Sequence, residues 1–143
     1  MSAQPIVTRT PEVRREERGH AFYLPEAALA AVPVLYATDD IPAEHTTIHA
    51  HYFAAWGDWY VAEFDPATGE AFGWARVGND DWVGEWGYID LPALESFRAD
   101  RPGLPHLVER DLHFTPRIAA ECLPKGRRRL RCKDEACAIC TRP

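Results

Sequence analysis

The stretch WYVAEFDPATGEAFGWARV, residues 59–77, decides the fold of this 143-residue chain. Residues 59–64 are aromatic and β-branched, and residues 71–77 resume the same character. Between them, Asp65 and Pro66 initiate a turn, and Gly69 can adopt a positive φ without steric cost. The stretch therefore predicts a β-hairpin over residues 59–77.

Further strands are predicted on both sides of the hairpin. The segment TTIHAHYFAAW, residues 46–56, alternates with a period of two. This alternation places Ile48, Ala50 and Tyr52 on one face of a strand and His49, His51 and Phe53 on the other. A polar loop at residues 79–81 precedes a short strand near residues 86–89. A last strand is expected over residues 107–114, ending before Pro116.

Two short helices are predicted around these strands. Pro25 suits a first helical turn, and the alanine-rich segment after it is stopped by Pro33. Asp90 is a predicted N-cap for a helix from Leu91, with Leu94 and Phe97 facing inward. The order of elements predicts an α+β fold, in which two short helices pack on one face of a small antiparallel sheet, with a Cys-rich C-terminal extension.

The chain length indicates one domain with a flanking segment at each end. Residues 1–20 are predicted to be a mobile N-terminal arm, or at most a short helix from Glu12. Residues 21–118 form the predicted α+β domain, and residues 119–143 a basic four-cysteine tail. The first twenty residues lack the apolar region of a secretory signal, and no apolar run is long enough for a bilayer. We therefore expect a cytoplasmic protein without a membrane partner.

Charge divides the chain into an acidic body and a basic tail. Residues 122–143 contain seven basic and two acidic residues, a net charge of +5. The net charge of the whole chain is -6, so residues 1–121 carry -11. Such a division predicts two surfaces with different tasks, although the body charge also serves solubility.

Four segments of the chain resemble a known family. They are VPVLYATDDIP (32–42), WYVAEFDPATGEAFG (59–73), GYIDLPALESF (87–97) and ERDLHFTP (109–116). In this order they resemble the domain of unknown function 2958 family, small uncharacterised domains of plasmids, phages and other mobile elements. The resemblance covers about residues 24–118 and implies an accessory protein of a mobile element, without implying a reaction.

All the cysteines of the chain lie in its tail, spaced C-x9-C-x4-C-x2-C: Cys122, Cys132, Cys137 and Cys140. Four thiolates complete the tetrahedral shell of a structural zinc ion, and C-x2-C is a common half-site. A segment this short cannot build a hydrophobic core, so a metal would supply its stability. The sequence therefore predicts zinc, with free thiols or disulfides as the alternatives.

The tail also contains four clustered arginines, Arg127, Arg128, Arg129 and Arg131. Guanidinium groups bind phosphates through paired hydrogen bonds, so this cluster predicts contact with nucleic acid. The alternative is contact with the acidic body of the same chain or of a neighbour.

All five tryptophans lie within 31 residues. Trp59 and Trp74 are predicted to fill the core. Trp56, Trp82 and Trp86 are predicted to form a partner surface, because tryptophan is favoured at interaction hot spots.

Polar residues offer weaker catalytic hypotheses. His49 and His51 could bind a metal with Asp58 or Glu63, but exposed strand histidines explain them more simply. Glu63 and Glu109 could be paired carboxylates for acid/base chemistry, or partners of Arg110 in a structural ion pair.

The function that combines these features is a non-enzymatic binding module of a mobile genetic element. Its acidic, aromatic-rich domain would bind a protein partner, and its zinc-held basic tail would contact nucleic acid or that partner. The alternatives are an acidic, DNA-mimicking inhibitor of a host nucleic-acid enzyme, and a metal-dependent hydrolase or nuclease.

Overall fold

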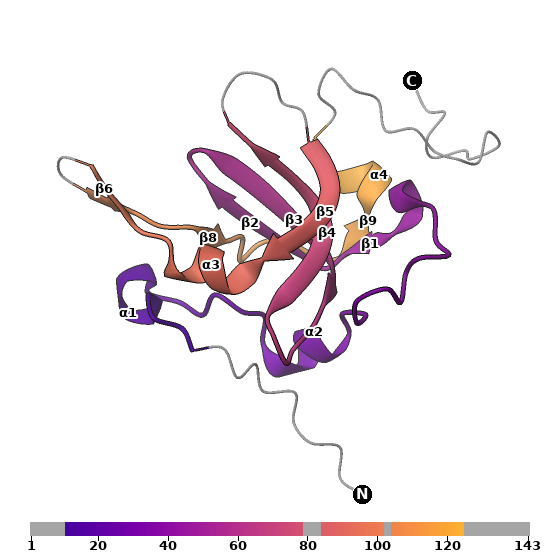
Figure 1. Cartoon of the computed structure of the whole chain (residues 1–143), viewed down its shortest axis with the longest axis horizontal. Coiled ribbons are helices and arrows are strands. Elements are labelled where there is room, and N and C mark those ends of the chain that lie inside the picture. Colours follow the sequence, from indigo (N-terminus) through magenta and orange to yellow (C-terminus); the bar gives the residue numbers. More distant parts are fainter. Residues whose placement is uncertain (1–10, 79–83, 102–103, 125–143) are drawn as a thin grey trace, which may run out of the picture.

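A computed structural model describes residues 11–78, 84–101 and 104–124. They form an α+β fold of short helices around antiparallel strands (Figure 1). The helices are α1 (Arg15–Arg18), α2 (Glu26–Ala30), the 3-10 helix η1 (Ala43–His45), α3 (Leu91–Ser96) and α4 (Ala119–Cys122). The strands are β1 (Thr47–Ile48), β2 (Ala50–Ala54), β3 (Gly57–Phe64), β4 (Glu70–Val77), β5 (Gly84–Asp90), β6 (Ala99–Arg101), β7 (Leu104–His106), β8 (Glu109–Arg110) and β9 (Arg117–Ile118).

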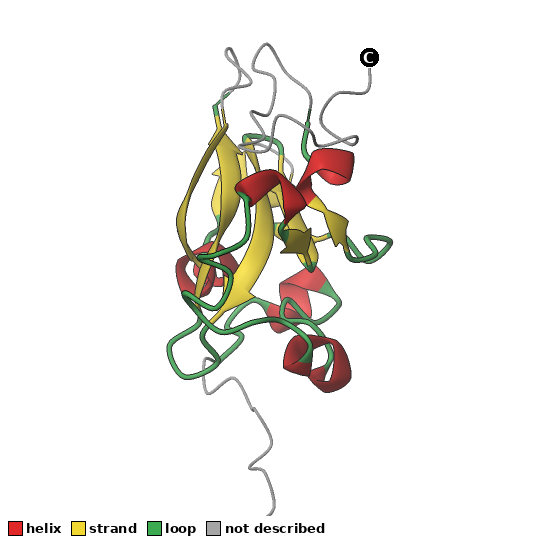
Figure 2. Cartoon of the chain, turned by 90° about the vertical axis from the view of Figure 1, so that its right-hand side faces the viewer, coloured by secondary structure: helices red, strands yellow, loops and turns green. Residues whose placement is uncertain are grey.

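The main sheet has five antiparallel strands in the order β5-β4-β3-β2-β8. Two smaller ladders, β1-β9 and β6-β7, accompany it, and the β6-β7 hairpin extends away from the main sheet (Figure 1). Figure 2 shows the strands of the sheet side by side with the short helices packed around them. None of the helices in the described residues is long and apolar enough to cross a bilayer.

The predicted hairpin is confirmed as β3 and β4. Asp65 opens the turn by accepting a hydrogen bond from the Ala67 backbone N–H at 2.9 Å, and Gly69 has a φ of 80°. In the paired strands, Gly73 lies where a Cβ would be 1.8 Å from the Tyr60 carbonyl oxygen. Only glycine permits this close approach of β4 to β3.

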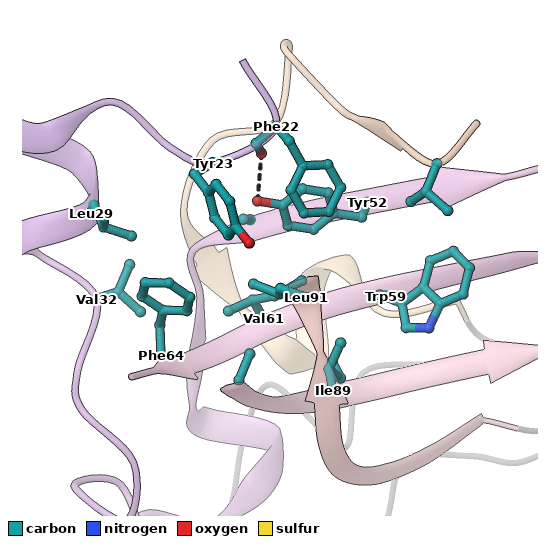
Figure 3. Packing of buried hydrophobic residues seen from close by; sticks show 13 residues of the cluster. Phe22, Tyr23, Leu29, Val32, Tyr52, Trp59, Val61, Phe64, Ile89 and Leu91 are labelled. Carbon is teal, nitrogen blue, oxygen red and sulfur yellow. Dashed lines mark hydrogen bonds between the residues drawn. The ribbon is translucent and has the colours of Figure 1, made fainter. Parts of the chain in front are cut away.

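One face of the sheet carries the larger hydrophobic core. Side chains from the strands meet residues that precede and follow α2, and residues from α3 and the segment before β8 (Figure 3). The cluster comprises Phe22, Tyr23, Leu29, Val32, Ala50, Tyr52, Trp59, Val61, Phe64, Ala71, Ile89, Leu91 and Val108. The buried Tyr52 hydroxyl donates a hydrogen bond to the Phe22 carbonyl oxygen at 2.7 Å. This bond satisfies the buried hydroxyl and joins β2 to the segment before α2.

The opposite face of the sheet carries a second core. It comprises Ile48, Tyr60, Ala62, Trp74, Ala119 and Leu123. The prediction that Ile48 shares a face with Ala50 and Tyr52 is therefore wrong. The strand is interrupted at His49, whose N–H donates to the Val61 carbonyl, and Ile48 pairs with Arg117 of β9 instead. The second core also extends beyond residue 118, because α4 supplies part of it.

The predicted cap of α3 is confirmed, and α2 begins one residue after Pro25, which was predicted within its first turn. Pro25 is the N-cap residue of α2, which ends before Pro33, and the Asp90 side chain accepts from the Ala93 N–H at 3.1 Å at the start of α3. Both helices contribute to the larger core, as do the half-buried Leu94 and Phe97.

The last predicted strand, residues 107–114, is wrong in length, since β8 contains two residues. Asp111 turns the chain at this point. Its side chain accepts from the His113 N–H at 3.0 Å and its carbonyl accepts from the Phe114 N–H at 3.3 Å. This local hydrogen bonding competes with the strand ladder.

The second half of the predicted arm packs on the domain, which agrees with its short-helix alternative. In α1, Arg18 is buried and its Nη1 lies 2.8 Å from Glu95 Oε2 of α3. Arg18 also donates to the Val108 carbonyl at 2.9 Å. The backbone N–H groups of Val13 and Arg14 complete the coordination of the Glu95 carboxylate. A buried ion pair that is hydrogen-bonded in this way joins α1 to α3.

Candidate interaction surface

Four aromatic side chains gather over β4, β5 and the loop before η1. Phe72 and Tyr88 are directly opposite in the β4-β5 register, and their ring centroids lie 5.5 Å apart. Phe72 also stacks with Trp86 at 6.2 Å, and Tyr36 meets Tyr88 edge-on at 6.3 Å. Because Trp86 and Tyr88 are two residues apart, they share one face of β5. We call Tyr36, Phe72, Trp86 and Tyr88 the aromatic surface.

The aromatic surface is open to solvent at one end. Tyr36 is 62% exposed and Tyr88 is 56% exposed, whereas Trp86 packs against the second core and is half-buried. Val34 and Ile41, in the same loop as Tyr36, are exposed as well. Exposed aromatic rings that contact one another, as Tyr36 and Tyr88 do, mark an interaction site more often than isolated exposed residues.

The backbone of Tyr36 is strained. Its φ is 72°, and it is the single non-glycine residue with a positive φ in the described part of the chain. The left-handed region costs an ordinary residue roughly 1–2 kcal/mol, and glycine would occupy it freely. The strained backbone places the Tyr36 ring against Tyr88.

A buried carboxylate holds this strained loop. Glu63 of β3 is 2% exposed, and its oxygens accept hydrogen bonds from the Tyr36 N–H at 2.8 Å and the Thr38 N–H at 2.9 Å. The Thr38 hydroxyl donates to the same carboxylate. Beside it, the Phe64 N–H donates to the Pro33 carbonyl at 2.9 Å. Hydrogen bonds with Glu63 and Phe64 of β3 thus hold the loop at Pro33 and at Tyr36 and Thr38.

The Tyr88 hydroxyl is neutral at physiological pH. A hydrogen bond with Tyr36, with added repulsion from the carboxylates of Glu70 and Asp39, raises the pKa of Tyr88 to about 12. The Tyr88 ring therefore keeps an electron-rich face without a negative charge of its own.

The chain segments that carry the aromatic surface are acidic. Segments 34–41, 70–75 and 84–90 contain no lysine, arginine or histidine. They contain five exposed acidic residues, Asp39, Asp40, Glu70, Glu85 and Asp90. The aromatic surface therefore lies in a region of negative potential.

A second polar cluster lies farther along the same sheet face, around His51. Its Nε2 is 2.8 Å from Asp58 Oδ1 and its Nδ1 is 3.1 Å from Asp111 Oδ2. The imidazole stacks on Tyr60 at 4.3 Å, and Arg76 holds the second oxygen of Asp58 at 2.7 Å. Each ring nitrogen of His51 therefore contacts a carboxylate oxygen.

The carboxylates of this cluster are stabilised in their charged form. Burial raises the pKa of Asp58, but hydrogen bonds from His51 and Arg76 outweigh it and leave that pKa lowered. The pKa of Asp111 is lowered in the same way, by His51 and the His113 N–H against the effect of burial. The cluster is a closed ionic network that ties β2, β3 and the segment after β8 together.

The metal hypothesis for the histidines finds no ligand set in the structure. His51 already uses both nitrogens, and Glu63 holds the Tyr36 loop. His49 is half-buried, and burial lowers its pKa. Among residues 11–78, 84–101 and 104–124, no group of three or more His, Cys, Asp or Glu side chains is placed to hold a metal.

The two predicted carboxylates have separate partners. Glu63 binds the Tyr36 loop, whereas Glu109 lies 2.6 Å from His20 Nε2. Arg110 donates to the Ala21 carbonyl at 3.1 Å. Glu63 and Glu109 therefore do not form a pair, and neither is an ion-pair partner of Arg110 in these contacts. The side chains of Glu109 and Arg110 in β8 instead contact His20 and Ala21 of the N-terminal segment.

The three tryptophans predicted to form a partner surface do not lie together in the described part of the chain. Trp86 belongs to the aromatic surface. Trp56 is half-buried against Trp59 and Phe97, each at 4.9 Å, so it packs beside the larger core. Trp82 lies outside the described residues. As predicted, Trp59 and Trp74 are buried.

Cys122 is the one predicted zinc ligand within the described residues. It lies at the end of α4, packs against the second core and is half-buried. Burial raises the pKa of its thiol to about 11. The other three ligands, Cys132, Cys137 and Cys140, lie outside the described residues, as do Arg127, Arg128, Arg129 and Arg131.

The sequence contains part of the signal for this site. Strand alternation places Trp86 and Tyr88 on one face. Tyr36 carries no such signal, because a tyrosine is not expected at positive φ. Its position follows from Glu63, which is distant in sequence.

No family model, curated protein sequence or solved structure matches this chain. The resemblance to the domain of unknown function 2958 family therefore stays a prediction.

Proposed function

We propose that this chain is a non-enzymatic binding module, and that its aromatic surface binds a basic polypeptide segment of a protein partner. The observation that carries the proposal is the strained backbone of Tyr36, which is held by the buried Glu63 while the ring stays exposed. Backbone strain of this kind persists where the surroundings enforce it, and it concentrates at functional sites.

The chemistry of the surface selects the partner. Lysine and arginine side chains are attracted to the faces of tyrosine and tryptophan rings. The carboxylates of Glu70 and Asp39, which act electrostatically on Tyr88, add attraction for the same cations. The negative potential also disfavours a nucleic acid at this site, so a basic polypeptide fits better than a polyanion.

A second part of the proposal concerns the C-terminal tail and is supported by its sequence. We propose that its four cysteines hold zinc and that its arginine cluster contacts nucleic acid or the same partner. The family resemblance adds the proposal that the module serves a mobile genetic element.

A synthetic peptide tests the aromatic surface. The probe is a fluorescently labelled ten-residue peptide that alternates arginine and valine, and a peptide with glutamate in place of arginine is the control. Fluorescence anisotropy is measured with the full chain. We expect the arginine peptide to bind and the glutamate peptide not to bind.

Matched variants locate the binding. The double variant Tyr36→Ala/Tyr88→Ala should weaken binding about tenfold, since it removes two cation–π contacts. Phe53→Ala removes a 40% exposed aromatic ring elsewhere on the sheet and should leave the affinity unchanged. Absence of binding to the arginine peptide, or equal losses in both variants, would contradict the proposal.

A further inference from the structure

Strand β5 is an edge of the main sheet. It contains seven residues and pairs with β4 on one side. On its other side, no strand of the described residues pairs with it. An edge of this length presents a row of backbone donors and acceptors to an incoming strand.

The direction of these backbone groups follows from the pairing of β4. The Glu70 carbonyl accepts from the Asp65 N–H, so the main chain of Glu70 faces the β3 side. Main-chain groups alternate along an antiparallel strand, so those of Ala71 and Gly73 face β5. Their register partners, Ile89 and Gly87, then face β4. The N–H and C=O groups of the intervening residues, Trp86 and Tyr88, therefore point away from the sheet.

We propose that the basic partner binds as an additional β-strand along β5, pairing with the main chain of Trp86 and Tyr88. This inference rests on the proposed function and specifies how the partner is held. Main-chain pairing would supply affinity, and alternate side chains of the partner would supply specificity. One set of those side chains would lie beside the aromatic surface.

The other set of side chains meets a groove on the opposite face of β4 and β5. The groove has a volume of about 370 Å³ and is lined by Ala75, Val77, Glu85, Gly87 and Ile89, together with Trp86 and Tyr88 at the edge of the sheet. A Cβ added at Gly87 would meet no atom within 4 Å, so the absent side chain leaves the groove open. Apart from Glu85, the described side chains of the groove are aliphatic, aromatic or absent, which suits an aliphatic side chain such as valine.

Charge argues against a second copy of this chain as the occupant. Strand β5 contains Glu85 and Asp90 and no basic residue. Two copies would bring these carboxylates together, on bodies that each carry -11 over residues 1–121. Like charges across paired strands are destabilising, whereas a basic strand is attracted.

Hydrogen exchange with the full chain tests the pairing directly. We expect a saturating amount of the arginine–valine peptide to slow amide exchange at Trp86 and Tyr88 by about tenfold or more. Exchange at Phe53, in the interior strand β2, serves as the reference. If the peptide binds and exchange at Trp86 and Tyr88 is unchanged, this inference is overturned while the proposed function stands. If the peptide does not bind at all, both fail.

A pair of variants separates the backbone from the ring. Tyr88→Ala and Tyr88→Pro both remove the aromatic ring, but only proline removes the outward N–H, and proline is tolerated at an edge in this orientation. We expect Tyr88→Pro to bind the peptide several-fold more weakly than Tyr88→Ala. Equal affinities for the two folded variants would overturn main-chain pairing at this residue.

Discussion

At the scale of single residues, the strain at Tyr36 makes a prediction about stability. Tyr36→Ala removes the ring and keeps a Cβ at positive φ, whereas Tyr36→Gly removes both. We expect the glycine variant to be more stable than the alanine variant by about 1 kcal/mol, because the relief of strain exceeds the extra entropy of unfolded glycine. Urea denaturation of both variants measures the difference. An alanine variant as stable as the glycine variant would show that the φ of 72° is not strained.

Glu63 explains why that strain persists. Its carboxylate accepts three hydrogen bonds from the Tyr36 loop. Glu63→Gln replaces one accepting oxygen by an amide donor that faces other donors, so the free energy of unfolding should fall by about 1.5–3 kcal/mol. The exposed Glu70, at the start of β4, provides the control, since Glu70→Gln should change stability by at most about 0.5 kcal/mol. Thermal denaturation of the two variants separates these outcomes, and equal stabilities would contradict the role of Glu63.

At the scale of elements, two glycines that face each other across β4 and β5 should respond differently to alanine. Gly73 approaches the Tyr60 carbonyl so closely that a Cβ has no space, whereas a Cβ at Gly87 meets nothing. We expect Gly73→Ala to destabilise the protein by roughly 2–3 kcal/mol through overpacking. Gly87→Ala should be neutral or slightly stabilising. Chemical denaturation compares the two, and a destabilised Gly87→Ala variant would contradict the open groove.

The His51 cluster predicts how stability depends on pH. The folded pKa values of Asp58 and Asp111 are lowered below an unfolded value of about 3.9, so their contribution is complete above that pH. It is lost as the pH falls through the folded values. Asp58→Asn should therefore cost about 2 kcal/mol at pH 7 and progressively less below about pH 4.

Denaturation of wild type and Asp58→Asn between pH 2 and pH 7 measures this difference. The exposed Asp40→Asn variant is the control and should follow the wild-type curve. A stability difference between Asp58→Asn and wild type that stays constant over this pH range would contradict the ionic network around His51.

The sequence predicts those elements whose signals are local. The hairpin of β3 and β4 follows from strand composition and the turn at Asp65, and α3 follows from its cap at Asp90. The last strand fails because Asp111 bonds its own backbone, which alternation does not reveal. The Arg18–Glu95 pair joins residues 77 positions apart, so no local pattern indicates it.

At the scale of the whole molecule, we expect the acidic body and the basic tail to have different sources of stability. The body folds around two cores on opposite faces of one sheet. The tail is predicted to depend on zinc. We expect mass spectrometry of protein purified without a metal-affinity tag to find one zinc per chain. Cys137→Ser/Cys140→Ser should lose that zinc, and a wild-type protein without metal would contradict the prediction.

The two faces of the sheet also divide the functional hypotheses. One face of the sheet is largely covered by the larger core, and the groove lies on the part of β4 and β5 that this core leaves uncovered. The other face carries both the His51 cluster and the aromatic surface. The His51 cluster is satisfied internally, whereas the aromatic surface exposes the rings of Tyr36 and Tyr88 in segments that also contain exposed carboxylates. This contrast is the reason for assigning binding to the aromatic surface.

The most direct measurement is a two-dimensional amide NMR spectrum of the ¹⁵N-labelled full chain, recorded while the arginine–valine peptide is added. We predict that the amide shifts that change concentrate at Tyr36, Phe72, Trp86 and Tyr88. The residues around His51 should be unaffected. Changes that centre on the His51 cluster, or that are spread evenly over the molecule, would contradict the assignment of binding to the aromatic surface.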